Sequence, residues 1–231
     1  AKIVAGVEDV FVRKLFEAGQ RTDNPRHIAT ALARVQVARS PEDERLAGKN
    51  LAEILQARGV ELSVRNGAEA LVDLGGQGAV GINHTLDAAP GGDVDRVMQF
   101  PLTAIASDGS VFEFGQDNPH PRSYGCFPRV LGHYVRERKL LTLEDAIHKM
   151  TQLPAERLGW KNRGLLAAGK FADVVVFDPQ QVTDKATFLE PHQHSVGVEH
   201  VLVRGELVLQ AGKMTGKLPG RPLPGGKRAD E

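Results

Sequence analysis

The sequence is poor in several features that would assign a protein to a class at once. One cysteine among 231 residues excludes an internal disulfide framework, and we expect Cys126 to be a buried or spectator thiol. No segment approaches the ~20 apolar residues that a membrane-spanning helix needs. Lys and Arg balance Asp and Glu at 29 each, so no net charge attracts nucleic acid or an acidic membrane. We therefore expect a cytoplasmic protein with neither nucleic acid nor membrane as a partner.

One loop carries the clearest candidate for chemistry. The apolar run at 102–106 is typical of a buried parallel strand, and Ser-Asp-Gly follows it at 107–109. In α/β barrels the carboxyl ends of the strands carry the chemistry, which favours a functional Asp108. Ser-Asp-Gly is also an ordinary turn sequence, so the tripeptide alone leaves both interpretations open. Arg122 follows in His-Pro-Arg-Ser-Tyr at 120–124 and brings a cation into the same loop.

Helical and strand patterns alternate along the first two thirds of the chain. Helical periodicity occurs at 7–17, 46–55, 67–74, 94–100, 127–138 and 143–150. Strand-like apolar runs occur at 33–38, 79–82 and 102–106. Thr142 and the acids after it form a capping pattern for the last helix. The order strand, helix, strand predicts parallel βαβ units.

The pattern changes after Trp160. Short apolar runs separated by glycines occur at 164–169, 172–177, 198–204 and 206–210. They predict antiparallel strands, with a hairpin turn at Val203-Arg-Gly-Glu206. The end of the chain is rich in Pro, Gly and charge, which predicts a flexible tail.

Motifs spread over the second half of the chain carry a resemblance to a known family. They are the segments Arg96–Pro101, Ile105–Gly109, His120–Gly125, Phe127–Arg136, Lys149–Ala155, Phe171–Pro179 and Gly216–Arg221. Together they closely resemble the N-acyl-D-amino-acid deacylases (D-aminoacylases) of the amidohydrolase superfamily. The resemblance is specific from about Arg96 to Arg221 and weak before that.

The resemblance implies an α/β fold that belongs to a metal-dependent TIM barrel. A complete barrel takes about 250 residues, so 231 residues cannot hold one together with a further module. We therefore expect the carboxyl-terminal part of a longer enzyme, or a shortened piece of one. The expected domains are a partial barrel over 1–158, a small β-sandwich module over 159–221 and a flexible tail over 222–231.

The chemistry that the resemblance implies is zinc-dependent hydrolysis of an N-acyl-D-amino acid to a carboxylate and a D-amino acid. Zinc lowers the pKa of a bound water to about 7, and a carboxylate moves the water's proton to the leaving amine. Asp108 matches the family's carboxylate at the end of the last barrel strand, as the catalytic base and as a metal ligand. Arg122 matches the residue that binds the substrate's α-carboxylate.

The family's metal-binding histidines and cysteine lie on earlier strands, and no motif here matches them. We therefore expect this chain alone to be inactive and to associate with itself or with an amino-terminal fragment. Other patterns are weaker. His192, His194 and His200 resemble a metal cluster, but no nearby carboxylate or cysteine is spaced to complete it. His84 at a strand end is better explained as a loop residue. Gly75-Gly-Gln-Gly78 lacks a phosphate-loop Lys and is expected to be a hinge or turn.

Two other functions remain open. A non-catalytic barrel fragment could bind a partner through its exposed edge, and a related amidohydrolase could act on a cyclic amide. Arg122 favours a substrate with a free carboxylate over the cyclic amide. No Gly-x-Ser-x-Gly elbow occurs, so serine-hydrolase chemistry has no support.

Overall fold

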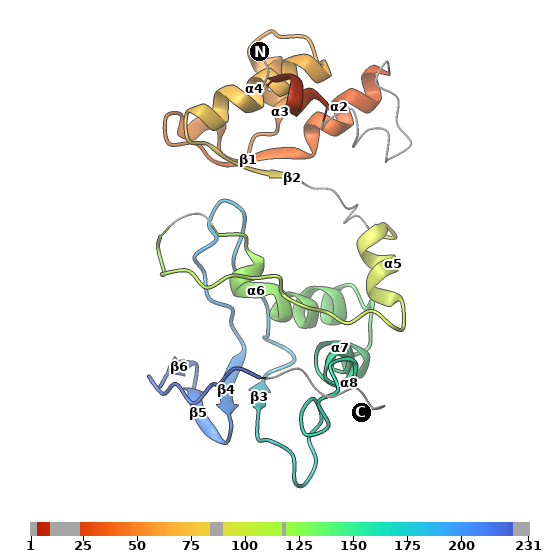
Figure 1. The fold of residues 1–231 in the computed structure, drawn as a ribbon, viewed down its shortest axis with the longest axis vertical. Helices are drawn as coiled ribbons and strands as arrows, with labels where there is room; N and C mark the ends of the chain where they lie inside the picture. Colours follow the sequence, from red (N-terminus) through yellow and green to blue (C-terminus); the bar gives the residue numbers. More distant parts are fainter. Residues whose placement is uncertain (1–3, 10–23, 84–89, 117–118, 224–231) are drawn as a thin grey trace. The chain divides into compact units, whose positions relative to one another are not determined.

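The computed structural model describes residues 4–9, 24–83, 90–116 and 119–223. The chain divides into two compact units, Ala1–Asp87 and Ala88–Glu231, and each unit has its own hydrophobic core. Their elements are drawn in Figure 1. Within the described ranges, no helix is long and apolar enough to cross a membrane.

The first unit is mostly helical. Its elements are a helical segment at 4–9, α2 (Pro25–Ala33), β1 (Val35–Arg39), the 3₁₀ helix η1 (Glu44–Leu46), α3 (Leu51–Ala57), α4 (Val64–Gly76) and β2 (Val80–Asn83). The side chains of Asn24, Asn50 and Ser63 accept backbone N–H groups at the starts of α2, α3 and α4, as capping residues do. Leu32 and Leu74 are fully buried in the core of the unit.

Most sequence predictions for this unit are confirmed within a few residues, because capping and periodicity are local signals. The glycine run differs. Gly75 and Gly76 belong to α4, which ends at Gly76, and the turn after it contains Gln77 and Gly78 at φ +76°. The greater part of the helix predicted at 7–17, and His84, lie outside the described residues.

The pairing direction of β1 and β2 corrects the sequence prediction. The two strands are antiparallel, with Val35 opposite Asn83 and Val37 opposite Gly81, and not members of a parallel βαβ unit. Two helices, α3 and α4, lie between the strands and contact each other. A parallel strand follows when one crossover helix carries the chain back to the end of the sheet where the first strand began. Here a second helix reverses the chain once more, so β2 starts at the opposite end and runs antiparallel to β1.

Five helices are described in the second unit. They are α5 (Asp93–Gln99), α6 (Arg122–Arg129), the π-helical η2 (Val130–Glu137), α7 (Leu143–Met150) and α8 (Gln152–Arg157). The helix predicted at 127–138 therefore starts earlier, and Arg122 is its first residue. The cap on α7 is confirmed, since the Thr142 side chain accepts the Asp145 N–H at 3.1 Å.

The strand predicted at 102–106 is not formed. Leu102 lies in a turn and residues 103–106 have no regular secondary structure, and the described part of the chain offers them no neighbouring strand. Ile105 donates its N–H to the Lys149 carbonyl at 2.9 Å, which is a contact with α7. A strand exists only through the ladder of hydrogen bonds to its neighbour, and an apolar sequence cannot supply that neighbour.

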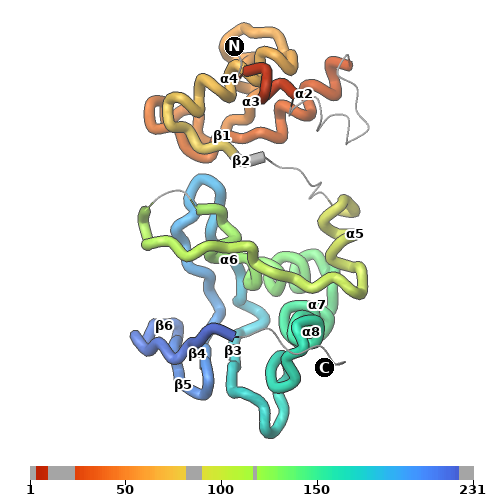
Figure 2. Tube along the Cα trace, in the orientation of Figure 1, coloured from red at the N-terminus to blue at the C-terminus, as the bar shows by residue number. Residues whose placement is uncertain are grey.

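The second unit ends in one antiparallel sheet with the order β3-β4-β5-β6. Its strands are β3 (Val174–Phe177), β4 (Val198–Val203), β5 (Glu206–Gln210) and β6 (Lys213–Met214); Figure 2 shows β3 in cyan and the other three in blue. The predicted hairpin is confirmed, with Arg204 at φ 53° and Gly205 at φ 82° in its turn. The run at 164–169 forms turns and no strand, because Gly164 and Gly169 both have positive φ.

A buried ion pair joins α5 to the end of η2. Asp95 is 3% exposed and accepts hydrogen bonds from Arg138 Nη1 at 2.8 Å and Nη2 at 2.5 Å. The Gly91 N–H donates to the same carboxylate at 2.7 Å. The hydrogen bonds from Arg138, followed by the one from Gly91, hold the pKa of Asp95 below its usual value.

This pair gives a pH-dependent contribution to stability. A carboxyl group whose pKa is lowered by folding stabilises the folded state above its unfolded pKa, and the stabilisation is lost as the pH falls towards the folded pKa. We expect Asp95→Asn to lower Tm by several degrees at pH 7, because it leaves Arg138 without its anion. The Tm difference from the parent should shrink below about pH 5. Asp93→Asn, an exposed position on the same helix, is the control, and an equal effect at both positions would contradict the assignment.

Candidate active site

Asp108 and Arg122, the two residues singled out in the sequence, lie in contact. Arg122 Nη2 is 2.7 Å from Asp108 Oδ2, and Arg122 Nε donates to the Asp108 carbonyl oxygen at 2.8 Å. The side chains are 42% and 82% exposed. Such an exposed ion pair contributes less than about 1 kcal/mol. The pair is therefore open to solvent and to an incoming anion.

The backbone around Asp108 is bent into the left-handed region, with φ 48° at Asp108. Asp tolerates this conformation better than most residues. The Ser107 hydroxyl accepts the Gly109 N–H at 3.2 Å, and the Ser123 hydroxyl accepts the Ser110 N–H at 3.3 Å. A Cβ at Gly109 would lie 3.0 Å from the Ser123 Cα, so a side chain there would push the loop away from α6.

His120 caps the first turn of α6, a role that the sequence analysis did not assign. Its Nδ1 accepts the Arg122 N–H at 3.1 Å, and its carbonyl accepts the Ser123 N–H at 2.9 Å. Because Nδ1 is an acceptor, the neutral ring carries its proton on Nε2. His120 thus fixes the backbone from which Arg122 reaches Asp108. Its place in the His-Pro-Arg run just before a helix is the signal that could have indicated this role.

Tyr124, two residues after Arg122, belongs to an aromatic cluster with Phe114, His192 and His194. His192 Nδ1 accepts the Gly115 N–H at 3.1 Å and lies 2.9 Å from the Tyr124 hydroxyl. Phe114 stacks on His194 with ring centroids 4.9 Å apart. His200 belongs elsewhere, because its Nδ1 accepts the Ala211 N–H at 3.2 Å beside the sheet. Of the three histidines that resembled a metal cluster, His192 and His194 thus share this aromatic cluster and His200 does not.

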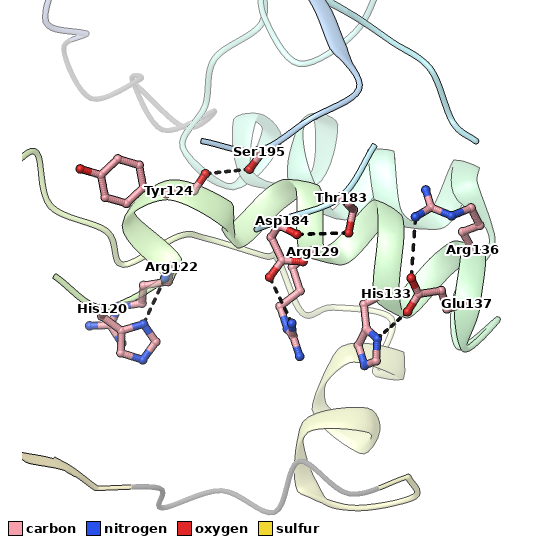
Figure 3. A network of polar contacts seen from close by, with 10 residues as sticks. All are labelled: His120, Arg122, Tyr124, Arg129, His133, Arg136, Glu137, Thr183, Asp184 and Ser195. Atoms are coloured by element: carbon pink, nitrogen blue, oxygen red, sulfur yellow. Dashed lines mark hydrogen bonds and ion pairs between the residues drawn. The ribbon is translucent and has the colours of Figure 1, made fainter. Parts of the chain in front are cut away.

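The segment that follows β3 holds α6 in place. A Cβ at Gly125 would lie 2.5 Å from the Asp184 Cβ, and one at Gly132 would lie 2.6 Å from the Val182 carbonyl oxygen. Figure 3 shows Asp184 turned towards Arg129, whose Nη1 donates to it at 3.1 Å. In the same view the Ser195 hydroxyl donates to the Tyr124 carbonyl at 3.0 Å. Arg122 is therefore placed by a helix with several anchors.

Cys126 is half-buried on α6 and donates its thiol to the Ala106 carbonyl at 3.5 Å. Burial, as the largest cause, raises the pKa of this thiol. A raised pKa lowers the fraction of nucleophilic thiolate. This environment agrees with the spectator role expected for Cys126.

A zinc site is not complete within the part of the chain that the structure describes. No group of three or more His, Cys, Asp or Glu side chains lies close enough there to hold a metal ion. Asp108 offers one carboxylate, whereas protein zinc sites generally use three or four ligands. The described residues alone therefore do not fit a bound zinc ion.

Comparison with known proteins identifies the family. The model of the amidohydrolase family matches residues 16–209. This chain belongs to the amidohydrolase family. Among the relatives of this amidohydrolase, the D-aminoacylase of Alcaligenes xylosoxydans xylosoxydans is 49% identical over 131 residues, which are 57% of this chain and 26% of the relative.

Two solved structures agree with that assignment. A D-aminoacylase that defines a novel subset of amidohydrolases superposes with a TM-score of 0.64 at 38% identity, covering 81% of this chain and 37% of the other. The N-acyl-D-glutamate deacylase of Bordetella bronchiseptica, complexed with zinc and a phosphonate mimic of the tetrahedral intermediate, gives a TM-score of 0.59 at 36% identity. It covers 88% of this chain and 38% of the other. The α/β fold of these deacylases is thus shared, and the chain spans little more than a third of either.

Proposed function

We propose that this amidohydrolase chain is the carboxyl-terminal part of a zinc-dependent enzyme that hydrolyses N-acyl-D-amino acids to a carboxylate and a D-amino acid. The observation that carries the proposal is the contact between Asp108 and Arg122 in a chain whose relatives include a D-aminoacylase. It joins a group able to move a proton with a group suited to bind a carboxylate. N-acyl-D-amino acids offer both an amide bond and an α-carboxylate.

Arg122 binds the α-carboxylate of the substrate in this proposal. A guanidinium pairs with a carboxylate through two parallel N–H donors, which fixes orientation as well as position. The Asp108 carbonyl oxygen accepts from Arg122 Nε, and the Asp108 carboxylate lies against Arg122 Nη2. Among the described residues, no hydrogen bond or ion pair of Arg122 Nη1 is seen. An incoming carboxylate can use this outer edge or displace the exposed Asp108 carboxylate. Either arrangement leaves the scissile amide beside Asp108.

Asp108 acts as the general base and then as the general acid. It takes a proton from the water that attacks the amide carbon, and it gives the proton to the amide nitrogen as the C–N bond breaks. The products are a carboxylate and a free D-amino acid, so the atoms and the proton balance. Zinc, which the solved N-acyl-D-glutamate deacylase contains, would be held with ligands beyond the described residues.

The finer architecture is part of the same proposal. Units of α/β structure up to about Leu158 would belong to a metal-dependent TIM barrel, and the sheet β3-β4-β5-β6 would belong to a small β-sandwich. The remaining strands of the barrel and of the sandwich would come from the further residues that the longer matched relatives contain. In this view the chain alone neither retains zinc tightly nor turns over substrate, and it associates with an amino-terminal fragment or with itself.

A chimera tests the proposal directly. The segment of the Alcaligenes D-aminoacylase that matches this chain is replaced by the residues of this chain, and hydrolysis of N-acetyl-D-methionine, its L enantiomer and a cyclic amide is measured. We expect zinc binding and turnover of the D substrate alone. Elemental analysis of the isolated chain after dialysis against a mild chelator should find less than one zinc per chain.

Two outcomes would contradict the proposal. One is a folded, zinc-loaded chimera that does not hydrolyse N-acyl-D-amino acids, with folding checked by circular dichroism. The other is a chimera that prefers the cyclic amide, which would support the related amidohydrolase activity. A non-catalytic partner-binding fragment predicts that none of the three compounds is hydrolysed.

A further inference from the structure

Lys149 is one of the few buried charged side chains in the described part of the molecule. It lies in the last turn of α7 and is 5% exposed. Among the described residues it makes no ion pair with a carboxylate, so uncharged hydrogen-bond acceptors must solvate its ammonium group. Burying an ammonium group costs several kcal/mol unless strong hydrogen bonds replace its hydration. The acceptors that replace this hydration therefore show which part of the chain Lys149 holds in place.

The Lys149 ammonium group donates to two backbone carbonyl groups of the segment after α5. Nζ lies 2.5 Å from the Phe100 oxygen and 3.3 Å from the Thr103 oxygen. The Lys149 carbonyl accepts the Ile105 N–H at 2.9 Å. One residue of α7 thus fixes three points of the backbone between residues 100 and 105.

The hydrogen bonds of Lys149 hold the segment that the sequence predicts to be a strand. Residues 102–106 have no neighbouring strand among the described residues, so they lack the ladder of hydrogen bonds that normally holds such a segment. The chain reaches Asp108 three residues after Ile105. Figure 2 shows this run leaving α5 and passing along α6, where Arg122 holds its far end through Asp108.

We infer that Lys149 is a positioning residue for Asp108. It holds the segment before Asp108, while Arg122 holds Asp108 itself, and neither support comes from a β-sheet in the described structure. The inference rests on the proposed function for its effect on catalysis. Its effect on the Asp108 backbone does not depend on that function. A displacement of about 1 Å at a catalytic group can cost up to about 100-fold in rate.

The first test uses this chain and needs no activity. We expect Lys149→Met, which keeps the length of the side chain and removes the donor, to shift the backbone amide resonances of Asp108 and Gly109 in ¹H–¹⁵N spectra. Lys170→Met is the matched control, because Lys170 Nζ also donates to a backbone carbonyl, that of Lys161 at 2.9 Å, away from Asp108. Unshifted Asp108 and Gly109 resonances in Lys149→Met would overturn the inference.

The second test measures kinetics in the active chimera. We expect Lys149→Met to lower kcat about tenfold with little change in KM, because Arg122 still binds the carboxylate. Tm should stay close to that of the parent, since an apolar side chain removes a buried charge. Lys149→Arg keeps a cation that can donate to both carbonyls and should restore most of kcat.

The outcomes separate this inference from the proposed function. A loss of kcat that only follows the unfolded fraction, or no loss at all, would show that Lys149 is merely structural and would overturn the inference while deacylase activity stands. Shifted Asp108 resonances together with a folded, zinc-loaded but inactive chimera would remove the proposed function and leave the backbone attachment in place.

Discussion

Asp108→Asn should lower kcat of the active chimera by about 100-fold or more, the usual weight of general acid–base catalysis. Asn keeps the size of the side chain and an oxygen that can accept a hydrogen bond from Arg122, but it cannot take the proton of the attacking water. KM should change little, because Arg122 retains its cation. Steady-state kinetics with N-acetyl-D-methionine between pH 7 and 8 measures both constants.

A nearby carboxylate provides the control for this variant. Glu113 is exposed in the same loop and makes no contact with Arg122 that the structure records. Glu113→Gln should leave kcat nearly unchanged. Near-normal turnover by Asp108→Asn would remove Asp108 from the mechanism, and an equal loss in both variants would indicate a general effect of loop charge.

Arg122→Lys should lower kcat/KM for N-acyl-D-amino acids by about 10- to 100-fold, because a Lys ammonium group cannot match the two oxygens of a carboxylate as a guanidinium does. It should also lose the hydrogen bond that Arg122 Nε makes with the Asp108 carbonyl at 2.8 Å. The diagnostic measurement compares an N-acyl-D-amino acid with its C-terminal amide. The amide lacks the carboxylate, so its already low rate should depend only weakly on residue 122.

The matched control lies on the same helix. Arg129 pairs with Asp184 at 3.1 Å and not with Asp108, so Arg129→Lys should alter neither substrate's kcat/KM by a comparable factor. If Arg122→Lys slows the acid and the amide equally, Arg122 does not recognise the α-carboxylate. Its role would then be to hold the Asp108 loop, as its contact with the Asp108 backbone also allows.

Several elements follow from the sequence because their causes are local. Asn50 and Ser63 cap their helices within three residues, and Thr142 does the same for α7. The β4–β5 turn follows from Arg204 and Gly205, which adopt the positive φ angles of a two-residue hairpin. Such signals act over one turn of chain, so a linear pattern contains them.

The direction and existence of strand pairing do not follow from the sequence where helices separate the strands. The apolar run at 102–106 has the composition of a strand, yet it is held by α7, and β1 pairs with β2 in the antiparallel sense. A run of apolar residues specifies burial but not the identity of its neighbour. Which segment becomes the neighbour depends on the direction in which the chain comes back to the run, and the packing of entire helices sets that direction.

The sequence alone indicated the candidate residues Asp108 and Arg122, since both lie in motifs that resemble those of the D-aminoacylases. Only the tertiary structure decided that they touch, and that the buried Lys149 donates to the backbone of the segment leading to Asp108. The physical reason is separation along the chain. Lys149 lies 46 to 49 residues from the carbonyl groups it binds, and no local pattern encodes a contact that folding creates.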